Sequence, residues 1–579
     1  MMRSHTCGEL TKEHIGMQVV LCGWVQSRRD HGGIIFVDLR DRYGLTQVVF
    51  DPSHDKRVHE IAEHISREYV LSVKGKVRHR KPGMVNEKLY TGEIEIITDE
   101  LEIINKTLDI PPIEVDDKKI ANDEIRLTYR YLDLRRPQMQ RNLLMRHVVV
   151  TAAREHFNQH GFLEIETPLL VKSTPEGARD YVVPSRINPG KFYALPQSPQ
   201  LYKQILMIAG CDRYYQVARC LRDEDLRADR QPEHTQFDFE MSFVTSEYIR
   251  AFVEGLYKHV FKKVLDVELE EFPVITYADA MAKFGSDKPD IRFKLELQEV
   301  TEICHKSDFS VFKNAASVKC LAPHKDFTRK EFDELGESCV NLGAKGMAWA
   351  KVTEKGLDSS IVKYIPEPVQ QELIKETHAK PGSSLLFIAD EEKKVNKILG
   401  QLRLRLGEQL GLINKNEFKF CFVTDFPLFA WNEDEERWEP EHHMFSMPKK
   451  EYITDFEKRP GDVIGDLWDV CLNGLELGSG SMRVSDPALQ ERIMNFIGIT
   501  KEQAKEKFGF LLEAYKYGAP VHGGMGLGVD RLVALMLGTN DIREVIAFPK
   551  NKNAECPMDD SPSDISEKQL RELHIQVKK

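Results

Sequence analysis

The sequence has no long apolar run, no cysteine pair spaced for a metal and no excess of positive charge. No apolar stretch approaches the roughly 18 residues of a membrane-spanning helix, and the start, MMRSHTCGELTKEH, lacks the apolar core of a secretion signal. The ten cysteines include no CxxC pair and no Cys/His group with zinc-finger spacing. We therefore expect a cytoplasmic protein without membrane segments, whose cysteines are reduced and buried.

Positive charge is gathered in short stretches. The formal net charge is −11 and the isoelectric point is about 6.0, which argues against a large basic surface for nucleic acid. Two local clusters remain, one around Arg28 and Arg40 and one from Lys74 to Lys81, and each could equally be a solvated face. With 579 residues, 41% hydrophobic and 30% charged, the chain predicts a globular protein of three or four domains.

Residues 1–105 predict a small β-barrel. Five stretches rich in Val and Ile, from VVLCGWVQSRR to GEIEIITDELEIIN, alternate or run apolar as strands do. Five strands of this size are typical of an OB-fold. Arg29, Phe36 and Gln47 suit the stacking and hydrogen bonding of unpaired bases. A protein-binding β-module is the alternative that these residues leave open.

The remaining chain divides into four segments. A Pro- and charge-rich stretch, LDIPPIEVDDKK, predicts a linker or hinge over residues 106–140. A helical pattern begins at Arg141, and helices and strands alternate over residues 141–286. Residues 287–420 form an α/β block without sharp motifs, and motifs resume over residues 421–579, which end in a polar tail. The middle block is therefore predicted to be inserted into a split domain.

The first motif is RCLRDEDLRADRQPEHTQFDFE, residues 219–240. Two strand-like ends flank a loop that carries Arg222, Arg227, Arg230 and several carboxylates. Planar, always charged guanidinium groups are expected where phosphate oxygens are held in pairs. The alternative is a solvated hairpin, which rarely needs so many arginines.

The second motif is GMGLGVDRLVALMLG, residues 524–538. The run LVALML predicts a buried helix closed by Gly538, with Arg531 in its first turn, where the helix dipole disfavours a cation. The glycines before it allow close backbone approach. An anion bound at the helix start would explain both features, and a packing role is the alternative.

The third motif is LWDVCLNGLELGSGSMR, residues 467–483. Asp469 and Glu476 are oxygen ligands of the kind that Mg²⁺ takes beside substrate phosphates. Arg483 follows GSGS, which predicts a turn that lets this side chain reach a pocket. The alternative is a surface hairpin with an incidental carboxylate pair.

Together the three motifs resemble those of the class II aminoacyl-tRNA synthetases. GFLEIETPLL with Pro168 is similar to the class's first motif, a helix–strand element of the dimer, the Arg222 loop to its second and the Arg531 helix to its third. TPEGARDY, LPQSPQLYKQ, RDEDLRADRQPEHTQ and GVDR resemble the bacterial-type aspartyl-tRNA synthetases, and the likeness covers nearly the whole chain. It implies an α+β multidomain fold with an N-terminal OB-fold barrel, a class II antiparallel sheet with flanking helices, and an inserted α/β domain. It also implies a homodimeric aspartate–tRNA ligase that uses ATP.

The resemblance assigns roles to residues. Arg222, Glu224 and Arg531 would be catalytic, with Arg222 on the α-phosphate of ATP and Arg531 on its terminal phosphate. Asp469 and Glu476 would carry Mg²⁺. The residues implied to bind ATP are Arg222, Asp223, Glu224, Gln231, Glu476, Gly528, Val529, Asp530 and Arg531. Those implied to bind L-aspartate are Glu176, Gln200, Leu201, Tyr202, Lys203, Arg222, Asp238, His442 and Arg483.

Helix geometry and charge bear on the amino-acid site. Ser198 is a good N-cap and Pro199 a good first helical residue, so Gln200 and Lys203 are expected on one helix face. Lys203 and Arg483 around a side-chain carboxylate would favour aspartate. Neutral asparagine would leave these buried charges unpaired, at a cost of about 2–5 kcal/mol.

Two barrel residues bear on the choice of tRNA. In this family, enzymes strict for tRNA(Asp) tend to carry leucine and lysine at two barrel positions, and enzymes that also charge tRNA(Asn) tend to carry His and Gly. This chain has His31, in RRDHGG, and Gly83, in RKPGMVN. We therefore predict relaxed specificity, with Asp-tRNA(Asn) amidated later by another enzyme. The alternatives are a strictly discriminating enzyme, an asparagine enzyme, which Lys203 argues against, and a silent RNA-binding paralogue.

Overall fold

The computed structural model describes residues 2–174, 177–226 and 228–578. Residues 1–145 and 543–564 form one unit, and residues 146–542 and 565–579 form a second. Residues 543–564 therefore belong to the first unit, whereas the sequence predicted them to lie in the second half of the split domain. Arg130 explains the difference, because its guanidinium donates to the carbonyls of Arg543, Ile546 and Ala547 at 2.8–2.9 Å.

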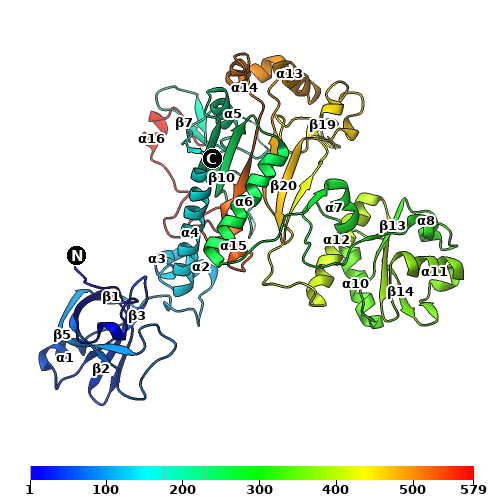
Figure 1. Cartoon of the computed structure of the whole chain (residues 1–579). Coiled ribbons are helices and arrows are strands. Elements are labelled where there is room, and N and C mark those ends of the chain that lie inside the picture. Colours follow the sequence, from blue (N-terminus) through cyan, green and yellow to red (C-terminus); the bar gives the residue numbers. More distant parts are fainter. Residues whose placement is uncertain (1, 175–176, 227, 579) are drawn as a thin grey trace. The chain divides into compact units, whose positions relative to one another are not determined.

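The first unit contains a closed five-stranded barrel in the order β1-β2-β3-β5-β4 (Figure 1). Alternate residues of β1, such as Val19, Leu21 and Val25, point into its core, as the period of two along a strand requires. The OB-fold barrel predicted for this region is confirmed. Its elements are β1 (Gln18–His31), β2 (Ile34–Arg40), β3 (Leu45–Phe50), α1 (Lys56–Ala62), β4 (Val70–His79) and β5 (Ile94–Asn105).

Short helices occupy much of the predicted linker. They are α2 (Asp123–Thr128) and α3 (Arg130–Asp133), followed by α4 (Pro137–Gln159). The long helix thus begins at Pro137, four residues before the predicted Arg141, because proline is well suited to a first helical turn.

The second unit is built on an eight-stranded sheet in the order β11-β17-β20-β21-β22-β10-β9-β6. All neighbouring strands are antiparallel except the two outermost pairs, β11–β17 and β6–β9. This confirms the expected antiparallel sheet. Its strands are β6 (Leu163–Glu164), β9 (Arg213–Leu221), β10 (Glu233–Ser242), β11 (Val274–Thr276), β17 (Phe420–Thr424), β20 (Leu467–Leu472), β21 (Leu475–Met482) and β22 (His522–Gly528).

The side chains of strand β10 alternate between the two faces of this sheet. Phe237 and Phe239 pack against Phe157 of α4, and Phe239 also against Phe252 of α6, at ring separations of 5.4–6.3 Å. The alternate residues Gln236 and Asp238 point to the opposite face, which lines a cavity. The remaining helices of this region are α5 (Gln200–Ile208), α6 (Ser246–Leu265), α7 (Tyr277–Phe284), α13 (Pro487–Phe496), α14 (Lys501–Tyr515), α15 (Val529–Met536) and α16 (Glu567–Glu572).

A separate five-stranded sheet, β12-β13-β16-β14-β15, lies between α7 and β17 in the chain. Helices α10 and α12 pack on one face and α8, α9 and α11 on the other. Its strands are β12 (Gln298–Glu299), β13 (Ser317–Leu321), β14 (Ala348–Thr353), β15 (Gly356–Asp358) and β16 (Ser384–Asp390). Its helices are α8 (Thr301–Cys304), α9 (Ser310–Lys313), α10 (Arg329–Asn341), α11 (Glu367–Glu376) and α12 (Glu392–Gln409).

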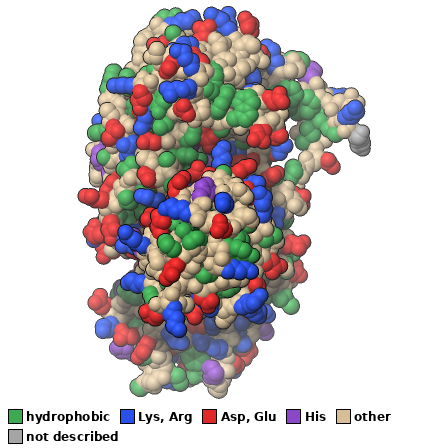
Figure 2. Space-filling model, turned by 90° about the vertical axis from the view of Figure 1, so that its right-hand side faces the viewer, with side chains coloured by type: hydrophobic (Ala, Val, Ile, Leu, Met, Phe, Trp, Pro, Cys, Tyr) green, Lys and Arg blue, Asp and Glu red, His purple; other side chains and the backbone are tan. Residues whose placement is uncertain are grey.

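Two hairpins complete the fold, β7 (Val182–Pro184) with β8 (Phe192–Ala194) and β18 (Phe429–Asn432) with β19 (Arg437–Pro440). Within the described ranges, no helix combines the length and apolarity needed to cross a membrane. Acidic and basic side chains are interspersed over the face shown in Figure 2, in keeping with the modest net charge of −11.

Candidate active site

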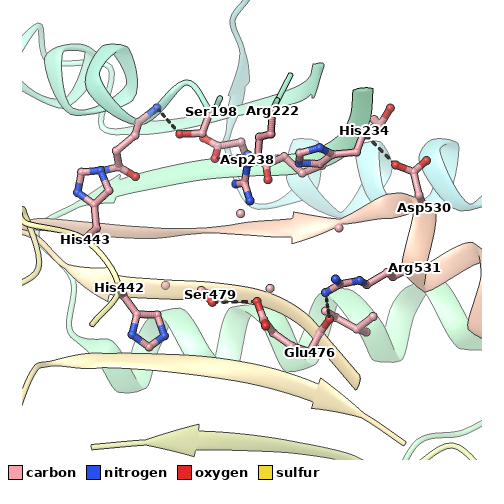
Figure 3. A pocket seen from close by; sticks show the side chains of 18 of the residues that line it. Ser198, Arg222, His234, Asp238, His442, His443, Glu476, Ser479, Asp530 and Arg531 are labelled. Carbon is pink, nitrogen blue, oxygen red and sulfur yellow. Dashed lines mark hydrogen bonds between the residues drawn. The ribbon is translucent and has the colours of Figure 1, made fainter. Parts of the chain in front are cut away.

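A cavity of about 410 Å³ opens on the face of the large sheet formed by β10, β21 and β22. His442 and His443 lie toward one end of it, and Asp530 and Arg531 toward the other (Figure 3). The cavity brings together the following predicted residues: Gln200, Lys203, Arg222, Glu224, Gln231, Asp238, His442, Glu476, Arg483, Gly528, Asp530 and Arg531.

One end of the cavity holds a buried network of four charges. Arg483 Nε donates to Glu240 Oε1 at 2.9 Å. Lys203 Nζ lies 3.1 Å from Asp238 Oδ2 and 3.3 Å from Glu240 Oε2. The two cations are therefore balanced by two carboxylates before any ligand binds. This corrects the expectation that asparagine would leave Lys203 and Arg483 unpaired.

Each cation of this network has at least one N–H group left for a ligand among the described partners. Lys203 has three N–H groups; one donates to Asp238 Oδ2, and the ammonium also forms an ion pair with Glu240. Of the five on Arg483, two go to Glu240, one to Ser481 Oγ and one to the carbonyl of Gly524. Among the described partners, one N–H on Arg483 is therefore left, and Lys203 also keeps donor capacity. Such donors suit the two oxygens of a carboxylate.

Several buried polar atoms that line the cavity have no hydrogen-bond partner among the described residues. Such atoms are costly in a folded protein unless a ligand or water satisfies them. They are Gln200 Nε2, Arg222 Nε, Asp238 Oδ1, His442 Nδ1 and His443 Nε2. Their convergence indicates a polar ligand with both donors and acceptors.

Burial and neighbouring charges shift the pKa of three groups near this end. It raises the pKa of Asp238 to about 6, against the opposing effect of Lys203. Burial, with Arg483 and Lys203, lowers the pKa of His443 to about 3, so this imidazole is neutral. Burial also acts to lower the pKa of His442, but Asp469 outweighs it and the pKa is raised. The pKa values of the two adjacent histidines are therefore shifted in opposite directions.

The other end of the cavity is lined by arginines of the β9–β10 loop and α15. Arg531 lies in the first turn of α15, where its Nη1 donates to the carbonyl of Glu476 at 2.9 Å and its Nη2 to Asp229 at 3.2 Å. Arg230 is paired with Glu224 at 3.1 Å. Burial, with Arg222 and Arg531, lowers the pKa of His234 here to about 3. A neutral ring among guanidinium groups suits a flat, anionic ligand.

Asp469 and Glu476 meet at one hydroxyl group. Ser479 Oγ donates to Asp469 Oδ1 at 2.6 Å and approaches Glu476 Oε1 at 3.3 Å. His442 Nε2 lies 3.3 Å from Asp469 Oδ1. Two hard carboxylate oxygens around one point suit a small divalent cation that is also held by phosphates. The described residues offer no group of three or more His, Cys, Asp or Glu side chains for a metal, so a cation here would need ligands from elsewhere.

The glycines before α15 serve close packing as well as the cavity. A Cβ on Gly524 would lie 2.0 Å from the carbonyl oxygen of Phe239, so a side chain cannot fit between β22 and β10. Gly526 and Gly528 line the cavity.

The predicted GSGS turn is wrong, because Gly478 to Ser481 form part of β21 and the turn lies at Asn473-Gly474. The Asn-Gly pair favours a tight hairpin turn.

Four of the residues implied to bind ATP or aspartate do not line the cavity, nor does Asp469, and one more lies outside the described residues. Leu201 and Tyr202 face a small hollow near Phe510, because α5 turns by about 100° per residue and only Gln200 and Lys203 point inward. Asp223 pairs with Arg179 at 3.5 Å, and Val529 is fully buried. Glu176 is not described.

The start of α5 also shifts by one residue. Pro199 takes the N-cap position, and Ser198 Oγ accepts the N–H of Gln200 at 3.3 Å. The expected common face of Gln200 and Lys203 is confirmed, since both line the cavity.

Glu240, His443 and His234 were not among the residues to which the resemblance gave a role, although Glu240 and His234 lie within the first motif. Glu240 could have been found, since FDFE alternates aromatic and acidic residues as a strand between a core and a polar site does. Neither histidine had a signal of its own, because its role depends on neighbours from other segments.

The predicted base-binding residues of the barrel lie close together. Arg29 stands opposite Phe36 on the paired strands, and its Nη2 donates to Gln47 Oε1 at 3.3 Å. His31 ends β1 with its ring 6.1 Å from that of Phe36. Gly83 lies in the β4–β5 loop with φ of 82° and open space around it.

Two family models match the chain. The family described as tRNA synthetases class II (D, K and N) matches residues 122–552, and the OB-fold nucleic acid binding domain matches residues 19–104. The first match covers well over half of the sequence. The chain belongs to the class II tRNA synthetases.

Among class II synthetases, curated relatives match the chain over its full length. A protein of Caldanaerobacter subterraneus subsp. tengcongensis named aspartate–tRNA(Asp/Asn) ligase is 51% identical over 100% of this chain and 98% of its own length. A protein of the same name from Treponema denticola is 48% identical over 100% and 99%.

Solved structures share the fold. The asparaginyl-tRNA synthetase of Pyrococcus horikoshii with asparaginyl-adenylate has a TM-score of 0.58 and 20% identity, and the match covers 95% of this chain and 98% of that one. A structure titled as a putative aspartyl-tRNA synthetase from Leishmania major has a TM-score of 0.59 and 17% identity, with 94% of each chain covered.

Proposed function

We propose that this chain is an aspartate–tRNA ligase that activates L-aspartate with ATP and transfers it to both tRNA(Asp) and tRNA(Asn). The observation that carries the proposal is the cavity with unsatisfied donors and acceptors at one end and Arg222 and Arg531 at the other. Two relatives at 51% and 48% identity, both named aspartate–tRNA(Asp/Asn) ligase, support the choice of substrate and tRNAs.

In the proposed reaction, the α-carboxylate of aspartate attacks the α-phosphorus of ATP and pyrophosphate leaves. No protein nucleophile is required, and positioning with charge stabilisation provides the catalysis. Arg222 contacts the α-phosphate, for which its buried and unpartnered Nε is suited. Arg531 takes the terminal phosphate, while Glu224, Gln231 and the start of α15 complete the ATP site.

For the amino acid, the proposal assigns the side-chain carboxylate to Lys203 and Arg483. N–H groups that remain on both side chains meet the two oxygens of the aspartate side chain, whereas asparagine would turn its NH₂ toward a donor. A site that leaves such groups unpaired can reject the analogue strongly. The unpartnered Asp238 Oδ1 accepts the substrate ammonium, and Gln200 and His442 supply further contacts.

A Mg²⁺ ion at Asp469 and Glu476 is part of the proposal. When bound, it would screen the phosphates against the attacking carboxylate. The two carboxylate oxygens around Ser479 fit a cation that phosphate oxygens also hold.

The rest of the organisation is proposed from the resemblance. The barrel over residues 1–105 would read the anticodon through Arg29, Phe36 and Gln47, and residues 106–140 would form the hinge. Residues 287–420 would be an insertion between the catalytic segments 141–286 and 421–579. A cytoplasmic homodimer completes the proposal.

Pyrophosphate exchange tests the activation step. The purified protein should exchange labelled pyrophosphate into ATP with aspartate and not with asparagine. Exchange with asparagine alone would indicate an asparagine enzyme, and no exchange with any amino acid would indicate a silent RNA-binding paralogue.

Substitutions at His31 and Gly83 test the relaxed tRNA specificity. The double variant His31→Leu with Gly83→Lys should lose about tenfold or more in charging of tRNA(Asn), which is about 1.4 kcal/mol, with charging of tRNA(Asp) within about twofold. Gly83→Ala is the control, because any side chain is strained at φ of 82°. An equal loss for both tRNAs would contradict a role of His31 and Gly83 in the choice between them. If Gly83→Ala shows the same loss, a strained loop is its cause.

A further inference from the structure

The segment that opens the inserted block brings a charged side chain to Glu476, which lines the cavity. Lys288 Nζ lies 2.8 Å from Glu476 Oε2. Ser479 Oγ approaches the other carboxylate oxygen, Oε1, at 3.3 Å (Figure 3). Lys288 does not line the cavity itself, and its side chain is 36% exposed. The ammonium thus occupies a place beside Glu476 for which another cation would compete.

Backbone contacts hold this segment in position. The fully buried Arg403 of α12 donates to the carbonyls of Asp290, Phe293 and Leu295 at 2.8–2.9 Å. On the other side, a Cβ on Gly474 in the β20–β21 turn would lie 3.2 Å from Asp290. The segment is therefore fixed between α12 of the inserted block and the hairpin that carries Glu476.

Lys288 is the ion-pair partner of Glu476 among the described residues. The nearby Arg531 donates to the backbone carbonyl of Glu476 and not to its carboxylate. A divalent cation on this carboxylate would repel an ammonium held 2.8 Å away. The long, flexible lysine side chain can swing into solvent when displaced.

We propose that Lys288 is a built-in counter-ion of Glu476 which a divalent cation must displace, so that the inserted block tunes the metal affinity of the ATP site. The inference rests on the proposed binding of Mg²⁺ by Asp469 and Glu476. It gives the inserted block, whose sequence contains no recognisable motif, a role in setting the metal affinity at Glu476.

Direct metal binding tests the inference. Mn²⁺ binding without nucleotide is measured by electron paramagnetic resonance on the full chain and on Lys288→Met, which keeps the apolar stem. Removing a competing charge from a partly exposed pair should tighten Mn²⁺ binding about tenfold. Lys288→Arg should stay close to the wild-type affinity. Circular dichroism verifies that each variant is folded.

A matched lysine and a double variant complete the design. Lys419→Met removes a comparable pair, 2.8 Å from Glu270, at the other end of the inserted block and away from the cavity lining, and should leave Mn²⁺ binding unchanged. In a Glu476→Gln background, Lys288→Met should have no further effect.

Equal or weaker Mn²⁺ binding by Lys288→Met overturns the inference. So does a difference that persists in the Glu476→Gln background, or a wild-type protein that binds no Mn²⁺. Failure of the proposed function is a separate result, seen as an absence of pyrophosphate exchange in a protein whose Mn²⁺ binding still responds to Lys288.

Discussion

Two groups of arginines, one buried around Asp133 and one lining the cavity, differ in how far the described residues satisfy their N–H groups. Asp133 is fully buried and accepts from Arg126 at 3.1 Å and from Arg130 and Arg136 at 2.7 Å. Arg126 also pairs with Glu544 at 2.8 Å. In the cavity, by contrast, Arg222 Nε is buried without a described partner.

This difference separates a structural cluster from a functional one. In the cluster around Asp133, Asp117 and Glu544 complete the balance of three arginines by three carboxylates. The cavity, with a volume of about 410 Å³, is lined by donors and acceptors that have no partner among the described residues. Arginine content alone therefore does not mark a site, whereas several unpartnered polar atoms that converge on one cavity indicate one.

The largest expected effect is on stability at Asp133. Asp133→Asn should lower the free energy of opening of α2 and α3 by about 3–5 kcal/mol, because it leaves three buried guanidinium groups undercompensated. Native-state amide hydrogen exchange of these helices measures this. The rate of pyrophosphate exchange per folded molecule should change less than about twofold. A loss of catalysis without a loss of protection would contradict the structural reading.

Arg222 should show the reverse behaviour. Arg222→Gln should slow pyrophosphate exchange by about 10²–10³, as removal of a charge-stabilising donor does. Because its Nε has no described partner to lose, the midpoint of thermal unfolding should barely move. Arg219→Gln, at an exposed arginine 3.5 Å from Glu233, is the control and should keep the rate.

Asp238 tests the ligand side of the comparison. Asp238→Asn should raise the KM for aspartate about tenfold, because the substrate ammonium loses a charged acceptor. Burial raises the pKa of Asp238 to about 6, so the carboxylate is charged above pH 6 and protonated below it. The wild-type KM for aspartate should therefore rise as the pH falls through 6, and this dependence should be absent in Asp238→Asn. The same pH dependence in both proteins would assign it to another group.

The sequence predicted elements whose signal is local. The hairpin β9–β10, the helix at Arg531 and the barrel all follow from periodicity and from turn or helix-start residues, and the structure has them. Helix geometry correctly placed Gln200 and Lys203 on one face. Leu201 and Tyr202, which only the resemblance implied to bind aspartate, face a small hollow outside the cavity.

The missing parts depend on contacts between distant segments. Glu240 pairs with both Lys203 and Arg483, and the three residues come from three separate segments of the chain. The charge balance of the site could therefore not be known from any one motif. The arginines around Asp133 looked like part of a linker because Glu544 lies more than 400 residues further along the chain. The Lys288–Glu476 pair likewise joins segments that the sequence assigned to different domains.

Charging of the two tRNAs tests the central claim most directly. The measurement is incorporation of labelled aspartate into transcripts of tRNA(Asp) and tRNA(Asn) by the purified protein with ATP and Mg²⁺. The proposed function predicts aspartate on both. Charging of tRNA(Asp) alone would contradict the relaxed specificity inferred from His31 and Gly83, and charging of neither would contradict the assignment as an aspartate–tRNA ligase.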